Sequence, residues 1–140
     1  MRFERVSNSV EETEGIAGEF ARGLPGGSVV ALAGEMGAGK TQFVRGMVLG
    51  LGGNRRMVSS PTFTLLNIYP TASLTVFHLD AYRTAGADDL EGIGFLELLE
   101  QGGVVVVEWP SRVESLLPAS TLRVEIVPLD ETTRRIALPF

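Results

Sequence analysis

The chain has 140 residues, which fits a single domain over residues 1–140 and excludes two independent cores. It has no cysteine, which excludes disulfides, thiolate metal sites and cysteine nucleophiles, and its charged N-terminus and lack of a long apolar run indicate a cytoplasmic protein that does not enter the membrane. A net charge of −5 at pH 7 disfavours direct binding to nucleic acid, so any contact with RNA is expected to come through partner proteins.

The N-terminal part predicts a short strand and a capped helix. The opening sequence RFERV alternates as a strand does, and Ser9 followed by Glu12 three residues later forms the pattern of a capping box. We expect the helix to end near Arg22, although two glycines inside it weaken the prediction. Its apolar residues recur at helical spacing and are Val10, Ala17, Phe20, Ala21 and Leu24.

A glycine-rich segment lies between a predicted strand and a predicted helix. Residues 28–33 (SVVALA) form a continuous apolar run of strand length, as expected for a parallel strand buried on both faces. After the glycines, residues 41–51 carry apolar side chains at helical spacing, and Gly-Gly-Asn at 52–54 ends the helix. Strand, glycine loop and helix therefore follow one another in the order of a phosphate-binding loop.

The rest of the chain predicts more strands than helices. A helical stretch is expected over 94–101, and strands over 64–69, 74–79, 104–107, 122–127 and 134–138. Short turns join the first two and the last two of these strands, which indicates antiparallel pairs. The predicted fold class is α/β, a P-loop NTPase-like three-layer domain with a mixed parallel and antiparallel sheet.

The glycine-rich segment itself, residues 34–41 (GEMGAGKT), matches G-x-x-x-x-G-K-[ST] at every fixed position. Its glycines let successive backbone N–H groups turn inward and surround phosphate oxygens together with the start of the following helix. Lys40 is expected to reach the β- and γ-phosphates and Thr41 to bind magnesium, so MgATP or MgGTP is the predicted ligand. The predicted nucleotide-binding residues are Glu35, Met36, Gly37, Ala38, Gly39, Lys40, Thr41, Gln42 and Trp109.

Two carboxylates end apolar strands, where a magnesium phosphate site needs them. Asp80 ends LTVFHLD and Glu108 ends VVVVE, so both are expected at the carboxyl edge of the sheet, where ligands bind in open α/β folds. One of them is expected to hold the metal beside Thr41, and the other to orient the attacking water. The sequence leaves open which carboxylate does which, and a capping or solvated strand end is the alternative for either.

The segment after the P-loop helix has both a functional and a structural interpretation. Thr62 or Ser60, in SSPTF at 59–63, lies where a switch loop bonds a phosphate or the metal shell in many P-loop proteins. The same sequence also forms a good turn. The adjacent Arg55 and Arg56 are expected as solvated surface, with a functional role as the alternative.

Three residues beside the two carboxylates are open to similar alternatives. His78, the only histidine, shares a strand face with Asp80 and is more often a structural residue than a base. Arg83 either stabilises phosphate charge or anchors a loop. Trp109, the only tryptophan, packs either near the nucleotide or in the core.

Residues 34–110 contain four motifs, in the order GEMGAGKT, SSPTF, HLDAYR and VVEWP. With these motifs in this order, the chain resembles the TsaE (formerly YjeE) family. That family comprises small bacterial ATPases required for threonylcarbamoyl modification of the adenosine next to the anticodon. The resemblance covers nearly the whole chain. It implies an ATPase that works with a TsaB–TsaD heterodimer, in which TsaD transfers the threonylcarbamoyl group to tRNA and TsaE resets the complex between turnovers.

The resemblance also implies roles for individual residues. Gln42 stands where a second hydroxyl residue is common in the family, and Ala81 where a leucine is common, so a hydroxyl contact at position 42 is lost. Neither departure removes a group that the chemistry needs. The implied roles are phosphate and magnesium binding for Lys40 and Thr41, a switch-like threonine at Thr62, and acidic or acidic-aromatic positions at Asp80, Glu108 and Trp109.

Three other functions stand as alternatives. A small-molecule kinase uses the same P-loop, but the chain has no long arginine-rich lid and no second substrate domain. A regulatory GTPase is disfavoured because no N-K-x-D tetrad occurs in the sequence. A non-hydrolysing nucleotide-binding scaffold would bind ATP tightly and release no phosphate.

Overall fold

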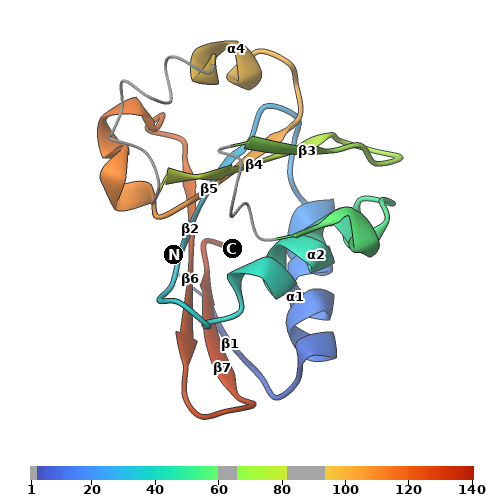
Figure 1. The fold of residues 1–140 in the computed structure, drawn as a ribbon, viewed down its shortest axis with the longest axis vertical. Helices are drawn as coiled ribbons and strands as arrows, with labels where there is room; N and C mark the ends of the chain where they lie inside the picture. The colour runs from blue at the N-terminus through green and yellow to red at the C-terminus, as the bar shows by residue number, and fades with distance from the viewer. Residues whose placement is uncertain (1–2, 60–65, 82–93) are drawn as a thin grey trace.

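A computed structural model of the chain describes residues 3–59, 66–81 and 94–140, whose strands form a seven-stranded sheet (Figure 1). The strand order is β1-β7-β6-β2-β5-β4-β3. Parallel pairs join β2 to β5 and to β6, and β4 to β5. The pairs β1–β7, β6–β7 and β3–β4 are antiparallel, which confirms the mixed sheet and both predicted hairpins.

The described elements begin and end close to the predicted positions. The strand predicted from residue 74 begins at Val76, and residues 64–65 of another predicted strand lie outside the described residues. Within the described ranges, no helix is long and apolar enough to cross a lipid bilayer. The bounds are β1 Phe3–Ser7, α1 Val10–Arg22, β2 Val29–Ala33, α2 Lys40–Gly50, η1 Arg55–Met57, β3 Leu66–Tyr69, β4 Val76–Asp80, α4 Phe95–Leu99, β5 Val104–Glu108, η3 Pro110–Arg112, η4 Glu114–Leu116, β6 Leu122–Pro128 and β7 Arg134–Leu138.

The central strands are buried on both faces, which is why their sequences are continuous apolar runs. In β5, Val104 and Val106 pack into a core shared with α1 and α2, which lie together beside the sheet (Figure 1). Val105 and Val107 point the other way and pack into a second core with α4. Because side chains alternate along a strand, Glu108 at the end of β5 lies on the α1 and α2 face.

The first helix begins at its predicted cap. The Ser9 hydroxyl accepts a hydrogen bond from the N–H of Glu12 at 3.1 Å, while the Glu12 carboxylate accepts one from the N–H of Asn8 at 2.9 Å. The return bond of the capping box is therefore made one residue before the cap. Val10, which the spacing places on the core side, is 46% exposed because it lines the edge of a cleft at this end of the helix, and Ile16 is buried instead.

Glycines bring α1 and α2 into backbone contact. A Cβ atom on Gly46 would lie 2.3 Å from the carbonyl oxygen of Glu14, and one on Gly50 would lie 2.5 Å from the Cα of Gly18. Both distances are far shorter than a normal contact, so larger side chains would push the helices apart. Gly18 is therefore a contact residue, whereas Gly15 is exposed and would have no atom within 4 Å of a Cβ.

Gly46→Ala is expected to lower the free energy of unfolding by about 1–3 kcal/mol, because overpacking outweighs a gain in helix propensity of about 1 kcal/mol. Gly15→Ala is the matched control, since it changes the same residue type within the partner helix without a clash. It is expected to raise the free energy of unfolding by about 0.5–1 kcal/mol. Urea unfolding measures both variants, and a stabilising Gly46→Ala would contradict the close helix contact.

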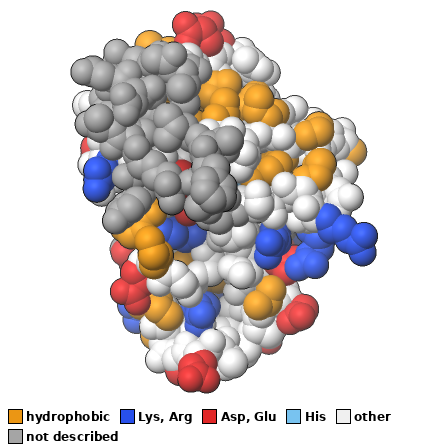
Figure 2. Space-filling model, viewed as in Figure 1, with side chains coloured by type: hydrophobic (Ala, Val, Ile, Leu, Met, Phe, Trp, Pro, Cys, Tyr) orange, Lys and Arg blue, Asp and Glu red, His pale blue; other side chains and the backbone are white. Residues whose placement is uncertain are grey.

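The two arginines after α2 differ in their environment. Arg55 donates two hydrogen bonds to the carboxylate of Glu14 at 2.7 and 2.8 Å, and Glu14 is buried in α1. On the face drawn in Figure 2, basic side chains gather beside acidic ones at this part of the molecule. Both arginines are exposed, as predicted for a solvated surface, and Arg55 is in addition the structural partner of a buried carboxylate.

Candidate functional site

The glycine-rich loop links the end of β2 to the start of α2. Gly37 has φ 79° and Gly39 has φ 104°, a conformation that glycine adopts without strain. A Cβ atom on Gly34 would lie 2.9 Å from the carbonyl oxygen of Ile126, so the loop also needs glycine where it passes β6. Backbone geometry thus favours glycine at all three glycine positions of the segment 34–41 in this structure.

The start of α2 differs from the start of α1 in a way that suits an anion. Ser9 caps α1 and two glutamates occupy its first turn, whereas Gly39 at the start of α2 provides no side-chain cap and the first turn has no acidic residue. Helix N-termini leave backbone N–H groups without helical partners and carry a partial positive charge. A phosphate group is the kind of ligand that satisfies both features.

Lys40 lies at the centre of the site and is buried. Its Nζ donates a hydrogen bond to the Gly34 carbonyl oxygen at 2.7 Å, lies 3.8 Å from Glu108 Oε1, and sits 3.9 Å from the centroid of the Trp109 ring. Burial lowers the pKa of Lys40, and the charges of Glu108 and, to a lesser degree, Asp80 partly oppose this effect. The ammonium group is therefore held among a carbonyl, a carboxylate and an aromatic face.

Lys40 is the only lysine in the chain, so selective ¹³C labelling of lysine gives a single side-chain signal to titrate. We expect its pKa below the ordinary lysine value, and a further decrease in Glu108→Gln, because that variant removes the main charge that favours the ammonium form. Phosphate affinity should accordingly fall as the pH rises through this pKa. A pKa at or above the ordinary value in the wild-type protein would contradict the burial of the ammonium group.

The two predicted carboxylates lie side by side at the carboxyl edge of the sheet. Asp80 of β4 and Glu108 of β5 are register partners on neighbouring parallel strands, so they share the face that α2 covers. Both residues line the same cleft as Lys40 and Thr41. The prediction that the two strands deliver their carboxylates to one place therefore agrees with the structure.

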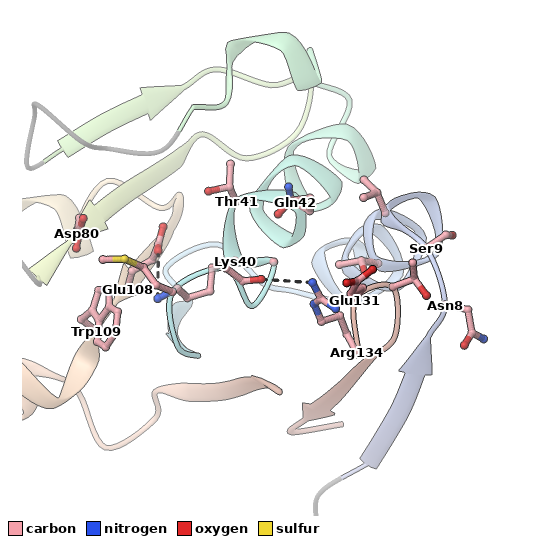
Figure 3. A pocket seen from close by; sticks show the side chains of 16 residues that line it. Asn8, Ser9, Lys40, Thr41, Gln42, Asp80, Glu108, Trp109, Glu131 and Arg134 are labelled. Atoms are coloured by element: carbon pink, nitrogen blue, oxygen red, sulfur yellow. Dashed lines mark hydrogen bonds and ion pairs between the residues drawn. The ribbon is translucent and has the colours of Figure 1, made fainter. Parts of the chain in front are cut away.

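The cleft has a volume of about 760 Å³ and runs along both sides of the P-loop (Figure 3). Asp80, Glu108 and Trp109 lie on one side of Lys40, and Asn8, Ser9, Glu131 and Arg134 lie on the other. Of the predicted nucleotide-binding residues, those that line the cleft are Met36, Gly37, Gly39, Lys40, Thr41, Gln42 and Trp109.

Some of the predicted residues that the structure describes do not line the cleft, and others cannot be placed. Glu35 is exposed in the loop and Ala38 is fully buried beneath it. Ser60, Thr62 and Arg83 lie outside the described residues. His78 is fully buried behind Glu108, which agrees with its structural interpretation more than with direct contact to a ligand.

Arg134 is a cleft residue that the sequence analysis missed. Its guanidinium donates hydrogen bonds to the carbonyl oxygens of Ala38 at 2.9 Å and Gly37 at 3.4 Å, within the P-loop. It also donates to the carbonyl oxygen of Asp130 at 2.8 Å, in the turn before β7. Arg134 therefore ties the β6–β7 turn to the P-loop, and no local sequence pattern marks this contact because the partners are nearly a hundred residues apart.

The turn that carries Arg134 is itself ordered by a side chain. The Asp130 carboxylate accepts hydrogen bonds from the backbone N–H groups of Thr132 at 2.9 Å and Thr133 at 2.8 Å, and these bonds lower its pKa. An aspartate that bonds the backbone two and three residues later is a common turn signal. The sequence D-E-T-T therefore contained a sign of the turn, although not of its contact with the P-loop.

Trp109 has an unusual backbone conformation. Its φ of 56° is the one positive value among the non-glycine residues that the structure describes. A bulky residue in this region is strained, and such strain is found most often at functional sites. This conformation places the indole ring against the second core, which agrees with the core interpretation, and over the Lys40 ammonium. Packing of Trp109 near a nucleotide stays a prediction.

The loop between β2 and α2, on this mixed sheet, defines a P-loop α/β protein. A family model described as Threonylcarbamoyl adenosine biosynthesis protein TsaE matches residues 7–136. The chain belongs to the TsaE family.

Named relatives are similar to this chain over most of their length. The tRNA threonylcarbamoyladenosine biosynthesis protein TsaE of Treponema pallidum is 42% identical over 133 residues, which cover 95% of this chain and 97% of that protein. The protein of the same name in Bacillus subtilis is 39% identical over 126 residues, which cover 90% and 78%. The crystal structure of B. subtilis YdiB matches with a TM-score of 0.79 at 31% identity, covering 99% of this chain and 84% of that one. The family and fold class predicted from the sequence are confirmed.

Proposed function

We propose that this chain is a single-domain cytoplasmic ATPase that binds and hydrolyses MgATP in support of a TsaB–TsaD complex, which makes threonylcarbamoyladenosine next to the anticodon of tRNA. The observation that carries the proposal is the cleft in which Lys40 and the uncapped start of α2 face Glu108 and Asp80. A positive helix terminus, an ammonium group and two carboxylates at one strand edge are the parts that a magnesium triphosphate site needs. Membership of the TsaE family supports the link to tRNA modification.

The triphosphate is proposed to lie along the P-loop. Backbone N–H groups at the start of α2 and the Lys40 ammonium supply the positive partners of the phosphate oxygens. To reach them, Lys40 exchanges its bond to the Gly34 carbonyl for a phosphate oxygen. The nucleoside end then has room on the Asn8 and Arg134 side of the cleft, because the other side ends at Trp109 and the two carboxylates.

The residues around the triphosphate suit magnesium. The ion prefers oxygen ligands, and it is usually bound by one or two carboxylates together with phosphates and waters. Thr41, Glu108 and Asp80 offer a hydroxyl and two carboxylates along one cleft. The described ranges contain no group of three or more carboxylate, histidine or cysteine side chains that could hold a metal ion without other ligands. The phosphates would therefore complete the magnesium site. Magnesium there would neutralise charge that develops on the phosphate oxygens.

We assign the metal to Glu108 with Thr41, and the orientation of the attacking water to Asp80. Glu108 is the carboxylate within ion-pair distance of Lys40, which also places it near the phosphates that the ammonium group contacts. Asp80 ends β4, which lies one strand farther from β2 and its P-loop than β5 does, and this agrees with a place farther from the phosphates. Thr62, outside the described residues, keeps its proposed switch-like role at the γ-phosphate.

The proposed partners can be tested with purified components. Phosphate release from MgATP should be weak for this chain alone and should change when TsaB–TsaD is added, and the two should co-elute at micromolar concentration in the presence of ATP. GTP should compete poorly, and phosphate should go to water. Failure to associate, or transfer of phosphate to a metabolite as in a kinase, would overturn the proposal. tRNA alone should not bind, because the chain carries a net charge of −5.

A further inference from the structure

We propose that Tyr69 and His78 are positioning residues that hold the Glu108 carboxylate beside Lys40 and tie it to the backbone of Ser59. The inference rests on the proposed function, because Glu108 is the carboxylate assigned to magnesium. Neither residue lines the cleft, so neither would touch the nucleotide. Their effect would pass through Glu108.

A chain of contacts leads from the carboxylate into the protein. His78 Nε2 forms a hydrogen bond with Glu108 Oε2, and His78 Nδ1 lies 3.2 Å from the Tyr69 hydroxyl oxygen. That hydroxyl in turn donates to the Ser59 carbonyl oxygen at 3.2 Å. An imidazole nitrogen and a carboxylate oxygen both carry lone pairs, so a hydrogen bond between them needs a hydrogen on one of the two. The imidazole therefore fixes one oxygen of Glu108 and leaves the other toward Lys40.

The sheet places these residues in one line. Tyr69, His78 and Glu108 lie on three successive strands, β3, β4 and β5, and their exposed fractions are 3%, 0% and 6%. Water has little access to the contacts between them, so each polar group depends on its protein partner. Removing one partner would therefore leave the carboxylate without a fixed direction.

A fixed carboxylate matters because metal ligands act through their supporting hydrogen bonds. Residues that orient a metal ligand are needed almost as much as the ligand itself, and their loss typically reduces metal affinity or activity by about 10- to 100-fold. The Tyr69 hydroxyl contacts both the Ser59 carbonyl oxygen and His78 Nδ1, so the backbone at residue 59 and the imidazole meet at this one group. Ser59 is the first residue of the SSPTF motif, which links this motif to the metal carboxylate.

Two amide variants of His78 separate positioning from simple packing. In His78→Gln, the side-chain amide nitrogen reaches about as far as Nε2 of histidine, so it can donate a hydrogen bond to Glu108. In His78→Asn, the side chain is shorter and its amide nitrogen reaches only as far as Nδ1, so it cannot donate to Glu108. We expect His78→Asn to raise the magnesium concentration for half-maximal ATPase activity by about 10- to 100-fold. His78→Gln should rescue most of this loss. ATP affinity in EDTA should stay the same in both variants, because the P-loop contacts do not involve His78.

Tyr69→Phe is the second variant, because it removes only the hydroxyl group and keeps the ring in the core. We expect a smaller rise in the magnesium requirement, of about 3- to 10-fold, since His78 keeps its bond to Glu108 but loses its support. Ile68→Ala is the control, because Ile68 neighbours Tyr69 on β3 but is 55% exposed on the other face. Equal magnesium requirements in Tyr69→Phe and the wild type, or equal losses in His78→Gln and His78→Asn, would overturn the inference.

A measurement without nucleotide separates this inference from the proposed function. His78 is the only histidine, so its two ring nitrogens give one identifiable pair of ¹⁵N signals. The Nε2 signal should shift in Glu108→Gln and the Nδ1 signal in Tyr69→Phe, whether or not ATP binds. Unchanged signals in both variants would refute the positioning contacts. Shifted signals in the variants, together with no MgATP binding by the wild-type protein, would instead refute the proposed function and the catalytic consequence drawn from it.

Discussion

Lys40→Ala is expected to reduce the rate of MgATP hydrolysis by about 10²- to 10³-fold. This is the typical loss when an enzyme lacks one hydrogen-bond donor to the negative charge that develops in the transition state. Lys40 is the only lysine, and its ammonium group lies between the P-loop carbonyl of Gly34 and the Glu108 carboxylate. No other ammonium group can take its place. Because the lysine contacts phosphate in the ground state as well, ATP affinity should fall along with turnover.

The control for this variant removes a positive charge elsewhere. Arg56→Ala changes an exposed cation in η1, outside the cleft, and should leave ATP affinity and turnover unchanged. Urea unfolding of Lys40→Ala should show that the protein stays folded, because His78 still contacts the Glu108 carboxylate that loses its ammonium partner. Normal ATP affinity in a folded Lys40→Ala protein would exclude a phosphate-binding role for Lys40.

Glu108→Gln is expected to have the second largest effect, a loss of hydrolysis of about 10²- to 10³-fold at ordinary magnesium concentration. The amide group keeps the shape of the side chain but removes the charge that a hard cation prefers. ATP binding in EDTA should persist, because the phosphate contacts of the loop are unchanged. Hydrolysis is measured as phosphate release over a range of magnesium concentrations.

Asp80→Asn is the matched comparison, because Asp80 is the register partner of Glu108 on the neighbouring strand. If Asp80 orients the water, Asp80→Asn lowers turnover while the magnesium requirement stays near that of the wild type. A larger rise in magnesium requirement for Asp80→Asn than for Glu108→Gln would reverse the two assignments. The pair of variants therefore decides the alternative that the sequence left open.

The P-loop and its flanking elements were predictable because their signals are local. A strand of apolar residues, a spaced set of glycines and the Lys40–Thr41 pair occur within about twenty residues of sequence, and each has its own physical reason. The carboxylates were also predictable, because Asp80 and Glu108 each end an apolar run and parallel strands end at the same edge.

The contacts around this site were not predictable, because they join segments that are far apart in the chain. Arg134 reaches the P-loop only because β7 pairs with β6, which in turn lies beside β2. Tyr69 and His78 form a line with Glu108 only because three strands are adjacent. Nothing in the spacing of these residues indicates such a neighbour.

Glycine in a helix shows the same limit on a smaller scale. Helix propensity alone treats Gly15 and Gly18 as equally unfavourable. The structure separates them, since Gly18 touches Gly50 of α2 and Gly15 faces solvent. Only the position of the second helix decides which glycine is a defect and which is a contact.

Calorimetric titration of the wild-type protein with ATP and magnesium tests the central claim most directly. The site predicts saturable heat with one nucleotide per chain, weaker binding when magnesium is removed, and a preference for ATP over GTP. The absence of heat with both nucleotides in the presence of magnesium would contradict the account, because a P-loop with Lys40 and an uncapped α2 would then hold no triphosphate.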